Sequence, residues 1–208
     1  MKRLIPLACV PAVVSILITT SPSQGEITGS LHDFSSSSWS GNQICLPCHT
    51  PHGADTSVPD APLWNHATST ANFTLYTSTS LDATVSQPTG RSLLCLSCHD
   101  GTVARDSFGG NTGTRFISPG STSHIGTDLR DDHPVSFTFN TALATADGGL
   151  HDPATQSTAL GGTIASDFLF NGRVECSSCH DVHNQQNNAG LLWVDNTGSA
   201  LCLTCHDK

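Results

Sequence analysis

The pentapeptide C-x-x-C-H occurs four times in this chain of 208 residues and takes up eight of its nine cysteines. In each copy the two thiols are three positions apart, so they lie on the same side of one helical turn, and the histidine follows directly. This pattern is typical of covalent c-type haem attachment, in which both thiols join one haem and the histidine binds its iron. The predicted thioether residues are Cys45, Cys48, Cys95, Cys98, Cys176, Cys179, Cys202 and Cys205. The predicted proximal iron ligands are His49, His99, His180 and His206.

Three other readings of the cysteines explain less of the pattern. A disulfide scaffold is common among exported proteins but gives no reason for a histidine after every pair. Zinc sites also use C-x-x-C pairs, yet they do not need that adjacent histidine. A thioredoxin-like redox pair would occur once, within a βαβ pattern. Four covalently attached haems are therefore the cofactors that we predict.

The composition suits a chain whose interior is supplied by cofactors. Hydrophobic residues make up 37% of the sequence, against about 45–50% in ordinary globular proteins. Gly, Ser, Thr, Asn and Pro interrupt nearly every window, and no long segment has a helical period. We expect mostly irregular coil, with short helices carrying the four motifs and few short strands (such as 135–139 and 191–194), wrapped around a stack of four haems.

The charge excludes two classes of partner. The net charge is −9, and a basic face, which binding to nucleic acid or to anionic lipid requires, is missing from the sequence. The acidic run that includes Asp128, Asp131 and Asp132 is read as a solvated face rather than as a calcium site.

The first 25 residues resemble a secretory signal peptide. Met1 to Arg3 form a basic start, Leu4 to Ile18 form an apolar stretch too short for a comfortable membrane span, and small polar residues follow. Cys9 lies inside this stretch and is expected to leave with it. We therefore predict a leader over 1–25 and a soluble, exported tetrahaem domain over 26–208. This domain contains two possible two-haem units, of about 26–120 and 121–208.

Histidines outside the motifs are the predicted distal iron ligands. Met1 is the only methionine and belongs to the leader, so a His/Met iron site cannot form. Bis-histidine ligation needs four distal histidines. The five candidates are His32, His52, His66, His133 and His183. His124 and His151 lie in loops rich in Ser, Gly and Asp and are expected to be exposed.

The motifs alternate between two types, which indicates a duplicated two-haem unit. The first and third copies continue with a second histidine, as His52 and His183, three residues past the proximal one. Such a histidine cannot easily fold back to its own haem and points naturally at a neighbouring one. The second and fourth copies share a different pattern, in which Leu precedes the motif, Leu follows its first Cys and Asp follows its His.

Several longer segments resemble the OmcE-type tetrahaem cytochromes. These segments are Leu31 to Phe34, Ile44 to His52, Pro62 to His66, Asp132 to Phe137 and Val174 to Asn184. Members of that family are exported electron carriers of metal-respiring bacteria, and some polymerise into extracellular filaments. The resemblance implies bis-histidine haems in a continuous stack, alternately parallel and perpendicular, that runs from subunit to subunit.

Electron transfer is the function that we expect, with other redox proteins and extracellular acceptors as partners. A head-to-tail homopolymer would make the chain a conducting filament. In such a polymer His32 could bind a haem of the next subunit, but ligation within its own chain or a hydrogen bond to a haem carboxylate is the reading that we favour. The alternatives are a monomeric periplasmic shuttle, a multihaem reductase, which needs an open iron position, and a scaffold that stores haem.

Overall fold

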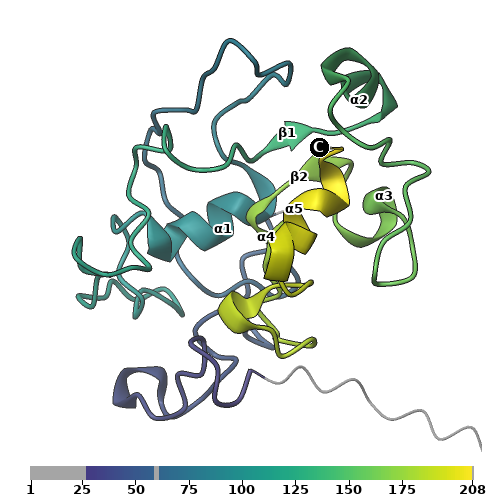
Figure 1. Ribbon diagram of the computed structural model, residues 1–208. Helices are drawn as coiled ribbons and strands as arrows, with labels where there is room; N and C mark the ends of the chain where they lie inside the picture. The colour runs from purple at the N-terminus through teal and green to yellow at the C-terminus, as the bar shows by residue number, and fades with distance from the viewer. Residues whose placement is uncertain (1–26, 59–60, 208) are drawn as a thin grey trace, which may run out of the picture.

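The computed structural model describes residues 27–58 and 61–207, and these consist mostly of loops and turns (Figure 1). The helices are η1 (Ser38–Ser40), α1 (Gly90–His99), α2 (Thr141–Asp147), α3 (Ile164–Asp167), α4 (Cys176–Cys179), η2 (Ala189–Leu191), η3 (Thr197–Ser199) and α5 (Ala200–Cys205). The strands are β1 (Phe137–Thr138) and β2 (Arg173–Val174), which pair antiparallel with Phe137 opposite Val174. The predicted fold of irregular coil with short helices and few strands is confirmed, whereas the predicted leader lies outside the described residues.

Local signals explain why the helices are short. The side chain of Asn140 caps α2 by accepting a hydrogen bond from the backbone N–H of Leu143 at 2.9 Å. The same helix ends at Gly148, whose φ of 69° is left-handed and costs glycine nothing. Within residues 27–58 and 61–207, no helix is long and apolar enough to cross a membrane.

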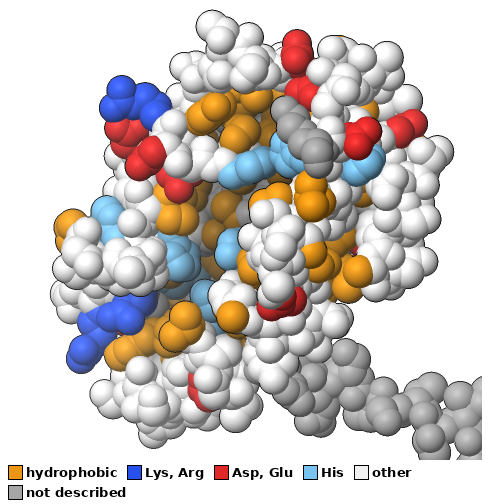
Figure 2. All heavy atoms as spheres, viewed as in Figure 1, with side chains coloured by type: hydrophobic (Ala, Val, Ile, Leu, Met, Phe, Trp, Pro, Cys, Tyr) orange, Lys and Arg blue, Asp and Glu red, His pale blue; other side chains and the backbone are white. Residues whose placement is uncertain are grey.

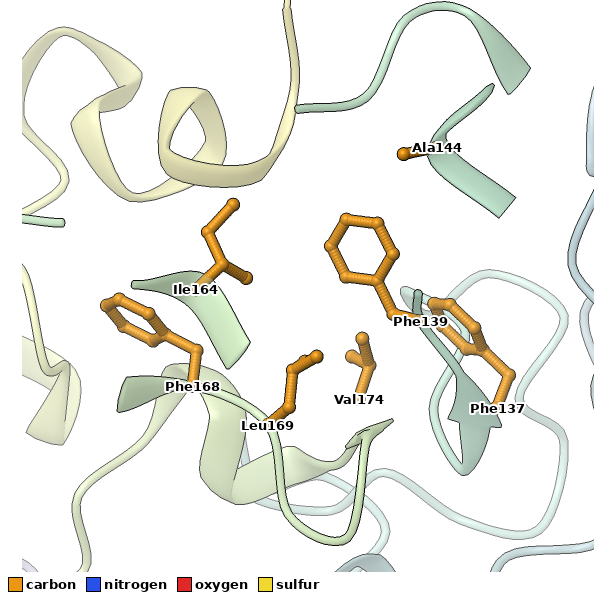
Figure 3. Packing of buried hydrophobic residues seen from close by; sticks show 7 residues of the cluster. All are labelled: Phe137, Phe139, Ala144, Ile164, Phe168, Leu169 and Val174. Carbon is orange, nitrogen blue, oxygen red and sulfur yellow. The ribbon is translucent and has the colours of Figure 1, made fainter. Parts of the chain in front are cut away.

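The larger hydrophobic core lies beside the two-stranded sheet (Figure 3). Its members are Phe137, Phe139, Ala144, Ile164, Phe168, Leu169 and Val174. They come from β1, β2, α2, α3 and the loops between them, and α5 packs against them through Leu201 and Cys205. This half of the chain therefore has a conventional core next to the fourth motif.

A smaller core supports the middle of the molecule. Phe73, Leu96 and Leu129 are buried together, with Leu96 only 1% exposed. Leu96 lies in α1, which runs through the centre of the fold and contacts α4 (Figure 1). The second and third motifs are consequently packed against each other.

The prediction that every motif lies on a short helix holds for three copies and is wrong for the first. The second, third and fourth copies lie on α1, α4 and α5, whereas the first is a single turn. In that turn the N–H of His49 donates to the carbonyl of Cys45 at 2.8 Å. Pro47 and Pro51 lack the N–H groups that a longer helix would need.

The two strand predictions had different outcomes. The segment 135–139 contains β1, as predicted. The segment 191–194 is not a strand, because Leu192 makes only an isolated bridge with His180. This bridge holds His180, a predicted proximal histidine, so the segment packs against a motif rather than forming a sheet.

Candidate haem-binding sites

The motif cysteines are unpaired, and six of the eight are half-buried, whereas Cys45 and Cys202 are exposed. None of the eight forms a disulfide bond, and the disulfide reading therefore receives no support from the described residues. Burial is the main reason that the pKa of Cys48 rises to about 11 and that of Cys98 to about 12. A raised pKa means that the neutral thiol is favoured, as expected for sulfur in an apolar environment.

Sulfur atoms of consecutive motifs lie close to one another. After burial, the nearby thiol of Cys48 is the next cause of the raised pKa of Cys98. The pKa of Cys95 is raised first by the neighbouring thiol of Cys176 and then by burial. The thiols of consecutive motifs that lie near enough to shift each other's pKa are those of Cys48 and Cys98, Cys95 and Cys176, and Cys179 and Cys205. The four motifs therefore form one continuous series.

Three of the predicted proximal histidines are held in one tautomer by a backbone carbonyl. The Nδ1 contacts are His49 with Pro62 O at 2.8 Å, His99 with Ser123 O at 2.6 Å, and His180 with Gly190 O at 2.9 Å. A carbonyl can only accept, so Nδ1 must carry the proton in each ring. The lone pair is then on Nε2, which is the arrangement that metal-binding histidines require.

Three of the predicted distal histidines face a proximal histidine. The ring centres are 6.0 Å apart for His32 and His99, 6.4 Å for His49 and His183, and 6.3 Å for His133 and His206. Two imidazoles that bind one metal ion from opposite sides, each with its nitrogen at about 2 Å, have ring centres roughly 6 Å apart. The spacing therefore fits one iron between the members of each pair.

Burial keeps His32 in the neutral form that can bind a metal. Its pKa falls to about 4, mainly through burial and then through the nearby His99 and His180. Nδ1 of His32 is buried without a hydrogen-bond partner among the described residues. His32 is thus folded against His99, a predicted proximal histidine of its own chain.

The two remaining candidates, His52 and His66, occupy very different places. His52 is exposed. His66 is 5% exposed, with Nδ1 2.7 Å from Ala67 O and Nε2 3.1 Å from Ala104 O. A neutral imidazole has one N–H, so only one of these contacts can be a hydrogen bond. Nε2 of His66 also lies 3.5 Å from Cys98 Sγ, beside the second motif.

The prediction that His124 and His151 are exposed is wrong, since both are half-buried. His124 lies against Gly101, just after the second motif. A Cβ added at Gly101 would lie 2.5 Å from Nε2 of His124. His151 donates its backbone N–H to Cys205 O at 2.9 Å. Both loops pack against motifs far away in the sequence, which the local composition does not reveal.

A set of hydrogen bonds is repeated around the first and third motifs, and the sequence analysis missed it. In the first, Thr50 N donates to Leu63 O (2.9 Å), Asn65 N to Cys48 O (2.9 Å) and Asn65 Nδ2 to Leu46 O (2.6 Å). In the third, Asp181 N donates to Leu191 O (2.6 Å), Trp193 N to Cys179 O (3.1 Å) and Trp193 Nε1 to Ser177 O (2.9 Å). We call each set a clamp.

Each clamp is built on a leucine in the left-handed conformation. Leu63 has a φ of 55° and Leu191 a φ of 56°, values that are uncommon for a residue with a branched side chain. The carbonyl just before each leucine is the one that accepts from the proximal histidine. The equivalent segments read Leu63-Trp64-Asn65 and Leu191-Leu192-Trp193, so the two clamps share only the first leucine in sequence.

The donor set and the surface fit haem groups. Figure 2 shows histidine and hydrophobic side chains gathered around a hollow on one face. Nε1 of Trp64, in a side chain that is 8% exposed, has no partner among the described residues. In the part of the chain that the structure describes, no three His, Cys, Asp or Glu side chains cluster as a metal-ion site. The histidines are instead arranged as facing pairs.

Comparison with known proteins agrees with this chemistry. Residues 170–208, which span the third and fourth motifs, match the family model described as "Doubled CXXCH motif". No curated protein matches the chain. The doubled motif indicates covalent binding of haem c and the electron transfer that such carriers perform. The chain is therefore supported as a multihaem c-type cytochrome.

Proposed function

We propose that this chain holds four covalently attached, bis-histidine c-type haems and conducts electrons along them. When bound, each haem supplies an iron that changes between the ferric and ferrous states by one electron. The single observation that carries the proposal is the facing of three histidine pairs with ring centres 6.0–6.4 Å apart. Two imidazole ligands leave an iron six-coordinate, so it can accept and release an electron with little rearrangement.

The residues of the chain have distinct roles in this proposal. The eight motif cysteines hold the four cofactors, and the backbone carbonyls of the clamps keep the proximal imidazoles in the iron-binding tautomer. We assign His32, His183 and His133 as the distal ligands opposite His99, His49 and His206. His52 and His66 are the candidates for the place opposite His180. The closeness of the thiols of consecutive motifs supports electron exchange from each haem site to the next.

Haem content and spin state test this assignment. The intact mass should exceed that of the processed polypeptide by four haems, and the oxidised protein should show only low-spin iron. Fewer than four haems would refute the count. A six-coordinate low-spin protein should also fail to bind carbon monoxide when reduced, whereas binding to the unmodified protein would favour a reductase with an open iron position.

We further propose that the protein is exported and assembles head to tail into an extracellular filament. The resemblance to the OmcE-type cytochromes motivates this step, and a contact that does not close on itself generates a fibre. Two exposed leucines, Leu31 and Leu63, at 87% and 53% exposure, and the exposed His52 offer surface for such a contact. A ligand contributed by the next subunit would account for a fifth candidate histidine.

Electron microscopy of the haem-positive extracellular fraction tests assembly separately from haem chemistry. Thin regular filaments that contain this polypeptide are the expected result. Small particles alone would contradict the filament and favour a shuttle that acts as a single molecule. The haem assignment would be unaffected by that outcome.

A further inference from the structure

Glu175 is a buried carboxylate that none of the roles above uses. It is 3% exposed and is the one glutamate among the described residues. Arg173 Nε donates to its Oε1 at 3.1 Å, and Oε2 accepts from Ser92 N at 3.2 Å, from Ser136 Oγ at 3.0 Å and from Ser92 Oγ. Every one of these partners is a donor, which is the environment of an ionised carboxylate.

These hydrogen bonds join the second motif to the third. Ser92 lies on α1, one turn before Cys95, while Glu175 immediately precedes Cys176 at the start of α4. The N–H of Cys176 also donates to Ser92 Oγ at 3.0 Å. The two helices are in contact, and the thiols of Cys95 and Cys176 lie near enough to shift each other's pKa. Glu175 is therefore at the joint where two thioether positions from different motifs meet.

Arg173, beside Glu175, cancels only part of the negative charge of the Glu175 carboxylate. The side chain of Arg173 is 30% exposed, against 3% for that of Glu175. Water and salt screen the exposed cation more strongly than the buried anion. A net negative field consequently remains at the joint between α1 and α4.

We propose that Glu175 is a positioning residue that fixes the second and third motifs together and lowers the reduction potential at their joint. The inference rests on the proposed function, since it concerns the haems that these motifs would hold. A fixed negative charge stabilises ferric iron relative to ferrous iron, because the ferric state carries one more positive charge. Reduction of a haem iron held at this joint is thereby less favourable than it would be beside a neutral side chain.

Substitution of Glu175 by glutamine in the haem-loaded protein tests the charge. At an effective dielectric constant of about 20 and a separation on the order of 10 Å, one unit charge changes a one-electron equilibrium roughly tenfold. Tenfold corresponds to about 59 mV for one electron. A redox titration followed by haem absorption should show at least one midpoint raised by about this amount in Glu175→Gln.

Asp128→Asn is the matched control. Asp128 is also paired with an arginine, at 2.5 Å from Arg130, but both side chains are more than half exposed. The same loss of charge in that exposed pair should leave all midpoints unchanged within about twofold in equilibrium constant, since screening is strong there. A shift in the control as large as that in Glu175→Gln would overturn the local effect that we propose.

Two further variants separate charge from shape. Glu175→Asp keeps the charge and should keep the midpoints, even where its shorter side chain lowers the melting temperature. Arg173→Gln leaves the carboxylate of Glu175 without its cation and should lower a midpoint. This variant tests the charge effect even if Glu175→Gln does not fold. Unchanged midpoints in Glu175→Gln or Arg173→Gln, or a raised midpoint in Glu175→Asp, would overturn the proposal.

The outcome for the unmodified protein distinguishes this inference from the proposed function. A wild-type protein without haem, or without a reversible one-electron titration, would refute both. A wild-type protein that titrates as a multihaem carrier, together with variants that do not shift, would refute the role of Glu175 alone.

Discussion

The two pairs of motifs differ in the length of chain between their motifs and in the size of the apolar core beside them. In the first pair the leading cysteines, Cys45 and Cys95, are 50 positions apart, whereas Cys176 and Cys202 in the second pair are 26 apart. The second pair adjoins the core of seven buried side chains, but the first has only the three-residue core for support. The first pair thus has the longer connection and the smaller apolar interior.

The clamp shows what the two pairs have in common. The first and third motifs each hold the proximal histidine by a carbonyl that precedes a left-handed leucine, Leu63 or Leu191. The part that is repeated is therefore a motif with its clamp, while the connections and cores differ. Since little apolar side chain surrounds the first motif, haem should supply most of its packing.

The largest expected effect is the loss of haem from the first pair. In Cys45→Ala/Cys48→Ala, amides of residues 44–66 should lose protection from hydrogen exchange, because few buried side chains remain to order them. In the matched variant Cys202→Ala/Cys205→Ala, amides of 137–174 should stay protected by the larger core. Hydrogen exchange with mass spectrometry measures both, and equal losses in the two halves would remove the distinction.

Truncation in the larger core should cost several kcal/mol. Ile164 is 0% exposed and lies among the seven buried residues. Ile164→Ala should lower the free energy of unfolding by about 2–5 kcal/mol, since it removes buried methyl groups and leaves a cavity. Leu31→Ala, at an 87% exposed position, should change it by less than about 0.5 kcal/mol. Chemical denaturation compares them, and similar values would show that the core carries little of the stability.

The facing histidines predict that a substitution beside the second pair of motifs changes an iron bound at the first pair. His183 follows the third motif but lies opposite His49. His183→Ala should keep all its haems, because thioether bonds do not need the distal ligand, and should turn one iron high-spin and able to bind carbon monoxide. His151→Ala is the control and should stay low-spin.

The same spectroscopy assigns the fourth distal ligand. Electron paramagnetic resonance of His52→Ala and His66→Ala should show one high-spin iron in one of these variants and none in the other. An unchanged spectrum in His183→Ala would contradict the pairing with His49.

Motif chemistry could be read from the sequence, whereas pairing could not. The spacing of cysteine and histidine predicts attachment and proximal ligands, since both depend on residues within one turn. Which histidine faces which is decided by contacts such as that of His133 with His206, 73 positions away. The clamp could not be predicted from the sequence because its acceptors are backbone carbonyls, which every residue has. The buried position of Glu175 could not be predicted either, because its hydrogen-bond partners come from three separate segments.

The smallest expected effect compares one hydrogen bond in the two clamps. The equivalent carbonyls of Leu46 and Ser177 accept from different side chains, Asn65 at 2.6 Å and Trp193 at 2.9 Å. Trp193→Phe removes that single donor and should lower the free energy of unfolding by about 1 kcal/mol.

Asn65→Leu should cost roughly 2 kcal/mol, because Oδ1 of Asn65 also accepts from the N–H of Gly109 at 3.1 Å, and two hydrogen bonds are lost together. Denaturant unfolding of the two variants under the same conditions gives the difference. If Trp193→Phe were the more damaging, the clamp of the third motif would depend on its side chain more than that of the first. The first clamp would then be held chiefly by its backbone hydrogen bonds and by haem.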